Sequence, residues 1–197
     1  MVTFCYHLGM PRIEAPTVVE HRAARERALL ASATRLLRQG GADAITLAAV
    51  ADDVGLTRTA VYKYFPSVKE LRHRVIADSF SSWAAIVAKD VAVAKTPAEC
   101  ISIFTRSSLR LASNGHHRAA VALGRLETDL DLADQHALLR APLVASLRAL
   151  GVSQPLIEAE LIDAIIGRAI SLMDDRRDSA AVEETTIALV DDLVASR

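Results

Sequence analysis

The sequence has few of the features that mark a secreted, membrane-spanning or disordered protein. Cys5 and Cys100 are the only cysteines among 197 residues, which argues against a disulfide framework and predicts two free thiols. The longest stretch without a charged residue, Met1–Pro11, has only eleven residues and cannot span a membrane. This stretch also lacks the basic start and the cleavage site of a secretory signal, so we expect a cytoplasmic protein.

Low-complexity tracts are absent too, and hydrophobic residues make up 51% of the chain, which predicts a packed core. Met10 offers a second plausible start, which leaves open whether residues 1–9 belong to the protein. We expect residues 1–16 to form a flexible N-terminal extension without a function of its own.

Motifs of catalysis and metal binding are missing. The chain has no glycine-rich phosphate loop and no nucleophile elbow, and its isolated Ser, His and Asp residues lack the spacing of a triad. His116 and His117, with Cys100 as a conceivable third ligand, are not accompanied by a spaced ligand set. We therefore expect no enzyme, no metal and no cofactor. A small all-α enzyme with an apolar active-site cavity remains the alternative.

Apolar residues recur three and four positions apart, and no alternating run predicts a strand. The sequence therefore indicates an all-α protein of about nine helices, with a three-helix domain over residues 17–66 and a helical body over residues 67–197. Capping and stop signals predict helices at Thr17–Gly40, Leu47–Val54, Thr57–Tyr64, from Ser67, at Thr96–Asn114, and at about 117–128, 133–150, 154–176 and 180–195.

Residues 46–65 have the pattern of a helix-turn-helix. The side chains expected to hold its two short helices at a steep angle are apolar: Leu47, Val50, Ala51, Val54, Leu56, Val61 and Phe65. Gly55 suits the turn between them, because a residue without a Cβ tolerates a positive φ.

The outward face of the second short helix is polar. It carries donors for phosphates and base edges, namely Thr57, Arg58, Thr59, Tyr62 and Lys63. The planar fork of Arg58 can pair bidentately with guanine, and Thr59 can touch a thymine methyl group. Three arginines on the preceding helix are compatible with either a solvated face or a DNA contact: Arg22, Arg25 and Arg27.

The run Tyr62-Lys63-Tyr64-Phe65-Pro66-Ser67 ahead of a long helix resembles the hallmark of the tetracycline-repressor-like (TetR) family, and the resemblance is strong over residues 22–76. It implies a transcription regulator that binds a pseudo-palindromic double-stranded DNA operator as a homodimer. Such regulators are usually repressors released by a small-molecule effector, and an activator of the same fold is the alternative.

The resemblance also assigns roles to residues. It implies phosphate contacts by Thr46, Thr57, Tyr62 and Tyr64, and it places Arg58, Thr59 and Lys63 in the major groove. A basic residue commonly follows the Pro-Ser pair in this family. Here Val68 has that position, and we expect the next residue, Lys69, to contact DNA.

In the body, the family resemblance places a four-helix dimer interface on the last two helices. The expected interface residues are Leu161, Ile165, Ile166, Ala169, Ile170, Met173, Leu189, Val190 and Leu193. The alternative is that both helices only cover a monomer core. The central helices are expected to enclose an effector pocket lined by Phe80, Trp83, Phe104, Arg106, Leu109, Arg125 and His136.

Charge is distributed unevenly along the chain. Residues 1–76 carry 11 Lys and Arg against 7 Asp and Glu, whereas the remainder carries 12 against 17. A basic front and an acidic back suit a DNA-contacting domain on a body that does not bind DNA. The near-neutral net charge of −1 disfavours a third alternative, a nonspecific DNA-packaging protein.

Overall fold

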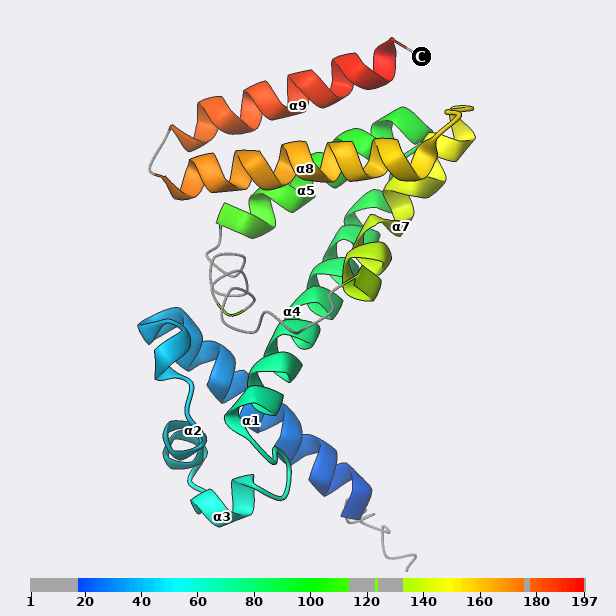
Figure 1. Ribbon diagram of the computed structural model, residues 1–197. Coiled ribbons are helices and arrows are strands. Elements are labelled where there is room, and N and C mark those ends of the chain that lie inside the picture. The colour runs from blue at the N-terminus through cyan, green and yellow to red at the C-terminus, as the bar shows by residue number, and fades with distance from the viewer. Residues whose placement is uncertain (1–17, 114–122, 124–132, 176–177, 197) are drawn as a thin grey trace, which may run out of the picture.

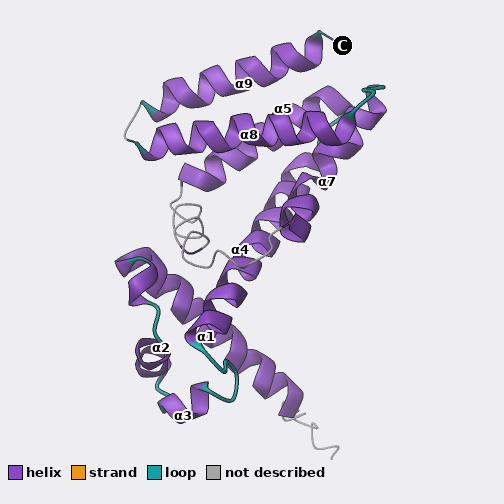
Figure 2. Ribbon diagram, viewed as in Figure 1, coloured by secondary structure: helices purple, strands orange, loops and turns teal. Residues whose placement is uncertain are grey.

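The computed structural model describes residues 18–113, 123, 133–175 and 178–196 (Figure 1). Every described element is helical, which confirms the all-α expectation (Figure 2). The elements are α1 (Val18–Gly40), the 3₁₀ helix η1 (Ala42–Ala44), α2 (Leu47–Val54), α3 (Arg58–Val61), α4 (Val68–Val91), α5 (Pro97–Ser113), α7 (Ala133–Ala149), α8 (Pro155–Asp174) and α9 (Ser179–Ala195). The helix expected at about 117–128 lies outside the described residues, apart from position 123.

The N-terminal helices pack around one apolar cluster, which we call the head core. Its buried members are Leu29, Leu30, Ala33, Leu37, Ile45, Leu47, Val50, Ala51, Val61, Phe65, Leu71, Val75, Ile76 and Leu123. The set includes the buried face expected for the helix-turn-helix, with Val54 and Leu56 packed against it. The head core also extends beyond residue 66 into α4 and takes one side chain, Leu123, from the chain between α5 and α7.

A second apolar cluster, the body core, joins the C-terminal part of α4 to α5, α7, α8 and α9. Helix α5 is central, because it contacts all four of these neighbours. Helices α8 and α9 lie against each other at the end of the molecule opposite α3 (Figure 1).

Helix α4 connects the two cores. Its 24 residues make it about 36 Å long at 1.5 Å per residue. Leu71, Val75 and Ile76 belong to the head core, whereas Val87 belongs to the body core. Arg72 Nη2 also donates to the Ala42 carbonyl at 3.3 Å, which ties the start of α4 to η1.

Local hydrogen bonds explain where several helices begin. The Ser67 hydroxyl accepts from the Glu70 N–H at 3.1 Å ahead of α4. Thr96 accepts from the Glu99 N–H at 3.1 Å ahead of α5, and the Glu99 carboxylate accepts from the Lys95 N–H at 2.7 Å. The returning carboxylate of this capping box therefore reaches one residue before the N-cap.

The second short helix differs from its expected length. Helix α3 ends at Val61, and residues 62–64 form a turn instead of continuing to Tyr64. The turn brings Phe65 into the head core, where 3% of the residue is exposed. Burial of this ring therefore takes precedence over continuation of the helix.

Candidate nucleic-acid interface

The helix-turn-helix is held by buried side chains and by one left-handed residue. Val50, Ala51 and Val61 are almost completely buried between α1, α2 and α3. Gly55 has φ 71° and ψ 35° at the C-terminus of α2, so the expected positive φ is present. The Leu56 N–H then donates to the Ala51 carbonyl at 2.9 Å, and this bond closes the turn.

Two of the expected phosphate-binding residues are N-caps. The Thr46 hydroxyl accepts from the Ala49 N–H at 3.0 Å, and the Thr57 hydroxyl accepts from the Ala60 N–H at 3.2 Å. A hydroxyl has one donor in addition to its acceptor lone pairs. Both residues are exposed, so each can cap its helix and still donate its proton to a phosphate.

Arg58 and Tyr62 contact each other on the exposed side of α3. Arg58 Nη2 donates to the Tyr62 hydroxyl oxygen at 3.2 Å, and the guanidinium carbon lies 5.7 Å from the ring centroid. Tyr62 is 44% exposed. The contact uses an acceptor site of the hydroxyl, which leaves the Tyr62 O–H able to donate to an anion.

The remaining expected DNA contacts lie around this pair. Thr59 and Lys63 are exposed, and Tyr64 is half-buried against the head core. Lys69 is exposed in the first turn of α4, next to the Ser67 N-cap. The structure therefore gathers the expected residues on and beside α3, with Thr46 at the start of α2.

Two features of this surface were not predicted from the sequence. Arg22, on α1, reaches the turn after α3, where its Nη2 donates to the Lys63 carbonyl at 3.3 Å. Asp53, on α2, accepts from the Ser32 hydroxyl at 2.5 Å and pairs with Arg35. The partners lie 18 to 41 residues apart, so no spacing rule joins them.

The expected effector-pocket residues are only partly brought together. Phe80 and Trp83 on α4 lie edge to face with ring centroids 5.3 Å apart, and His136 on α7 lies 4.9 Å from Phe80. Phe104 and Leu109 are buried in the body core, whereas Arg106 is exposed on α5. Arg125 lies outside the described residues.

The expected dimer residues fall into two groups. Ile166, Ala169, Ile170 and Val190 are buried in the body core of this chain. Leu161 and Leu189 are each 57% exposed, and Ile165, Met173 and Leu193 are half-buried. The outward apolar face of α8 also includes Leu156 and Ile157, which are 59% and 54% exposed.

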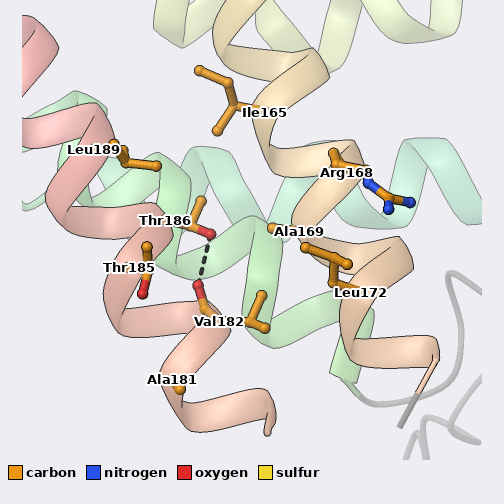
Figure 3. A pocket seen from close by; sticks show the side chains of 9 residues that line it. All are labelled: Ile165, Arg168, Ala169, Leu172, Ala181, Val182, Thr185, Thr186 and Leu189. Carbon is orange, nitrogen blue, oxygen red and sulfur yellow. Dashed lines mark hydrogen bonds between the residues drawn. The ribbon is translucent and has the colours of Figure 1, made fainter. Parts of the chain in front are cut away.

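A groove of 390 Å³ runs between α8 and α9 on this side of the molecule (Figure 3). Its lining is almost entirely apolar, with Arg168 at its edge: Ile165, Arg168, Ala169, Leu172, Ala181, Val182, Thr185, Thr186 and Leu189. The Thr186 hydroxyl donates to the Val182 carbonyl at 2.7 Å and is therefore satisfied within α9.

In the part of the chain that the structure describes, no helix is long and apolar enough to cross a bilayer. No group of three or more His, Cys, Asp and Glu side chains there is arranged to hold a metal ion. His116 and His117 lie outside the described residues.

The small N-terminal domain exposes a capped, polar helix as helix-turn-helix domains do, and one long helix joins it to a helical body. Residues 29–75 match the family described as bacterial regulatory proteins, tetR family. No curated protein sequence matches the chain.

Solved structures share the fold over most of their length. FadR, a fatty acid degradation regulator from Bacillus halodurans, is 14% identical with a TM-score of 0.70, and the match covers 84% of this chain and 94% of that one. A TetR transcriptional regulator from Streptomyces coelicolor is 22% identical with a TM-score of 0.58, covering 86% and 97%. FadR from Bacillus subtilis, in complex with stearoyl-CoA, is 13% identical with a TM-score of 0.63, covering 83% and 96%.

The matched segment contains α2, α3 and the start of α4, and the solved neighbours share the arrangement of 83–86% of this chain. Residues 29–75 are thus similar to the tetR family of bacterial regulatory proteins, and the solved structures show that most of the chain has the fold of such regulators.

Proposed function

We propose that this protein is a sequence-specific DNA-binding transcription regulator that inserts α3 into the major groove. The observation that carries the proposal is the exposed polar row on α3, presented by a scaffold whose apolar side chains are buried. Thr46, Thr57, Tyr62 and Tyr64 are proposed to contact phosphates and to set the register on the duplex. Arg58, Thr59 and Lys63 are proposed to face the base edges, with Lys69 at the flanking backbone.

We propose that the regulator acts as a homodimer through α8 and α9. Leu156, Ile157, Leu161 and Leu189 are exposed apolar side chains of α8 and α9, and so much exposed apolar surface on two neighbouring helices is unusual for a monomer. A two-fold interface brings the same face of both copies together and repeats the reading helix for a pseudo-palindromic site. Residues buried in the body core contribute to this interface only by supporting the two helices.

The proposed mode of action is repression in the cytoplasm, relieved by a small molecule that binds the body. The structure of FadR from Bacillus subtilis in complex with stearoyl-CoA supports ligand binding by a protein of this fold. In this chain the aromatic contacts among Phe80, Trp83 and His136 lie between α4 and α7, beside the helix that leads to the head. An effector that favours one orientation of α4 weakens DNA binding that needs another.

Selection of binding sites from random double-stranded DNA tests the proposal. A dimeric regulator should enrich two half-sites in inverted orientation, separated by about one helical turn or a multiple of it. Recovery of bound DNA without any common sequence would indicate nonspecific packaging, and absence of bound DNA would contradict DNA binding altogether.

A further inference from the structure

Helix α3 has only four residues, which is too short to be stable by itself. Its orientation therefore depends on the packing of Val61 in the head core and on what holds the turn that follows it. From the inside, Phe65 fixes this turn in the head core. From the outside, the turn meets Arg22 of α1.

Arg22 makes two contacts with the turn. Its Nη2 donates to the Lys63 carbonyl at 3.3 Å, and its guanidinium carbon lies 5.4 Å from the centroid of the Tyr64 ring. The planar guanidinium can stack on a ring and donate within its own plane at the same time, which an ammonium group cannot do. The same face of α1 holds α4, because Glu26, four residues on, pairs with Arg74 at 3.5 Å.

We propose that Arg22 is a positioning residue for DNA binding, which fixes the turn at residues 62–64 and thereby aims Tyr62 and Lys63 at the duplex. The inference rests on the proposed function. It assigns Arg22 a role within the protein, in contrast to the phosphate contact that an exposed arginine on this domain otherwise suggests. The two roles differ in their dependence on salt, because only a phosphate contact releases a counterion.

The test compares Arg22→Met with a matched control, Arg27→Met. Arg27 is also exposed on α1, and it lies about 140° around the helix from Arg22 at 3.6 residues per turn. Each variant removes one positive charge. The probe is the duplex that the unmodified protein selects from random DNA, and its dissociation constant is measured over a range of KCl concentrations.

Loss of one hydrogen bond and one cation–π contact predicts that Arg22→Met weakens binding about five- to thirty-fold. The slope of log K against log salt should equal that of the unmodified protein and of Arg27→Met. A slope that falls by about 0.9 in Arg22→Met alone would assign Arg22 to a phosphate and overturn the proposal. Unchanged affinity would overturn it as well.

Hydrogen exchange without DNA provides an independent measurement. The hydrogen-bonded amides of residues 62–65 should exchange faster in Arg22→Met than in Arg27→Met, while those of α8 and α9 stay unchanged. Equal exchange at residues 62–65 would overturn the positioning role. If the unmodified protein selects no DNA sequence, the proposed function fails, whereas the exchange comparison still decides whether Arg22 fixes the turn.

Discussion

Arg58 and Tyr62 are both expected to contact DNA, yet they also contact each other. The guanidinium lies against the phenol ring and donates to its hydroxyl oxygen. We expect Arg58 to leave Tyr62 when it pairs with a base edge, whereas Tyr62 can donate to a phosphate without leaving its place. The two residues are therefore expected to contribute differently to affinity and to base preference.

Substituting these two residues separately distinguishes the roles. Arg58→Ala should retain binding and lose preference at one base pair of each half-site, because a bidentate pair contributes about 1–3 kcal/mol of discrimination. Tyr62→Phe should weaken all sites alike, because it removes a donor to the backbone. Selection from random DNA with each variant checks both outcomes. An unchanged consensus from Arg58→Ala would exclude Arg58 as a base-reading residue.

Gly55 offers a second test at the level of one residue. Among the described residues nothing lies within 4 Å of an added Cβ, so Gly55→Ala introduces only backbone strain at φ +71°. That strain should lower the free energy of unfolding by about 1–2 kcal/mol, measured by urea denaturation at fixed protein concentration. In helix α8 a Cβ added at Gly167 also has no atom within 4 Å. Gly167→Ala should therefore raise the free energy of unfolding by about 0.5–1 kcal/mol. Equal effects of the two substitutions would contradict the backbone explanation.

Pairs of neighbouring helices are joined by the same arrangement in both halves of the molecule. A serine and an arginine three residues apart bind one carboxylate of the adjacent helix. In the head, Ser32 and Arg35 of α1 bind Asp53 of α2. In the body, Ser107 and Arg110 of α5 bind Asp90 of α4, at 2.5 Å and 2.6 Å.

Because Ser107 is buried, the stability of the Ser107–Arg110–Asp90 contact should depend on the charge of Asp90. Asp90→Asn should lower the free energy of unfolding by about 1–2 kcal/mol, a value reduced for the exposure of Arg110. The control is Glu160→Gln, because that carboxylate is 65% exposed and lies 3.7 Å from Arg140. Its effect should stay below about 0.5 kcal/mol. Urea denaturation of both variants measures the difference, and equal losses would show that the buried serine adds nothing.

Helices and their ends were predictable where a local rule decides them. The side chains of Thr46, Ser67 and Thr96 accept the hydrogen bonds expected of N-caps, and Gly55 has the expected φ. The length of α3 was not predictable, because burial of Phe65 depends on the position of α1 and α4. The contact between Arg22 and the Lys63 carbonyl crosses 41 residues and follows only from the folded structure.

Sequence periodicity also could not predict which apolar residues of α8 are buried in the body core and which are exposed for the proposed dimer partner. This helix is apolar on two faces, so Ile166 and Leu161 look alike in the sequence. In the structure Ile166 is 3% exposed and Leu161 is 57% exposed. Only the position of α5 and α9 decides which face turns inward.

For the whole molecule, the exposed face of α8 and α9 predicts the oligomeric state. The unmodified protein should have twice the chain mass of 21.2 kDa in sedimentation equilibrium. Leu161→Glu and Leu189→Glu should each produce a monomer, because a buried, unpaired carboxylate disfavours association. Val93→Glu is the control, since Val93 is 71% exposed beyond the end of α4. A dimeric Leu161→Glu variant would contradict the proposed interface.

The burial of Leu123 in the head core affects how the molecule unfolds on heating. This fully buried side chain belongs to the head core although it comes from the chain between α5 and α7. A fragment that ends within α4 would contain a hole in its place, and such holes cost about 2–5 kcal/mol in leucine-to-alanine substitutions. We therefore expect the head to be less stable without the body, and calorimetry of the intact chain should record one heat-absorption peak. On heating, the body and helices α2 and α3 of the head should then unfold in a single cooperative transition.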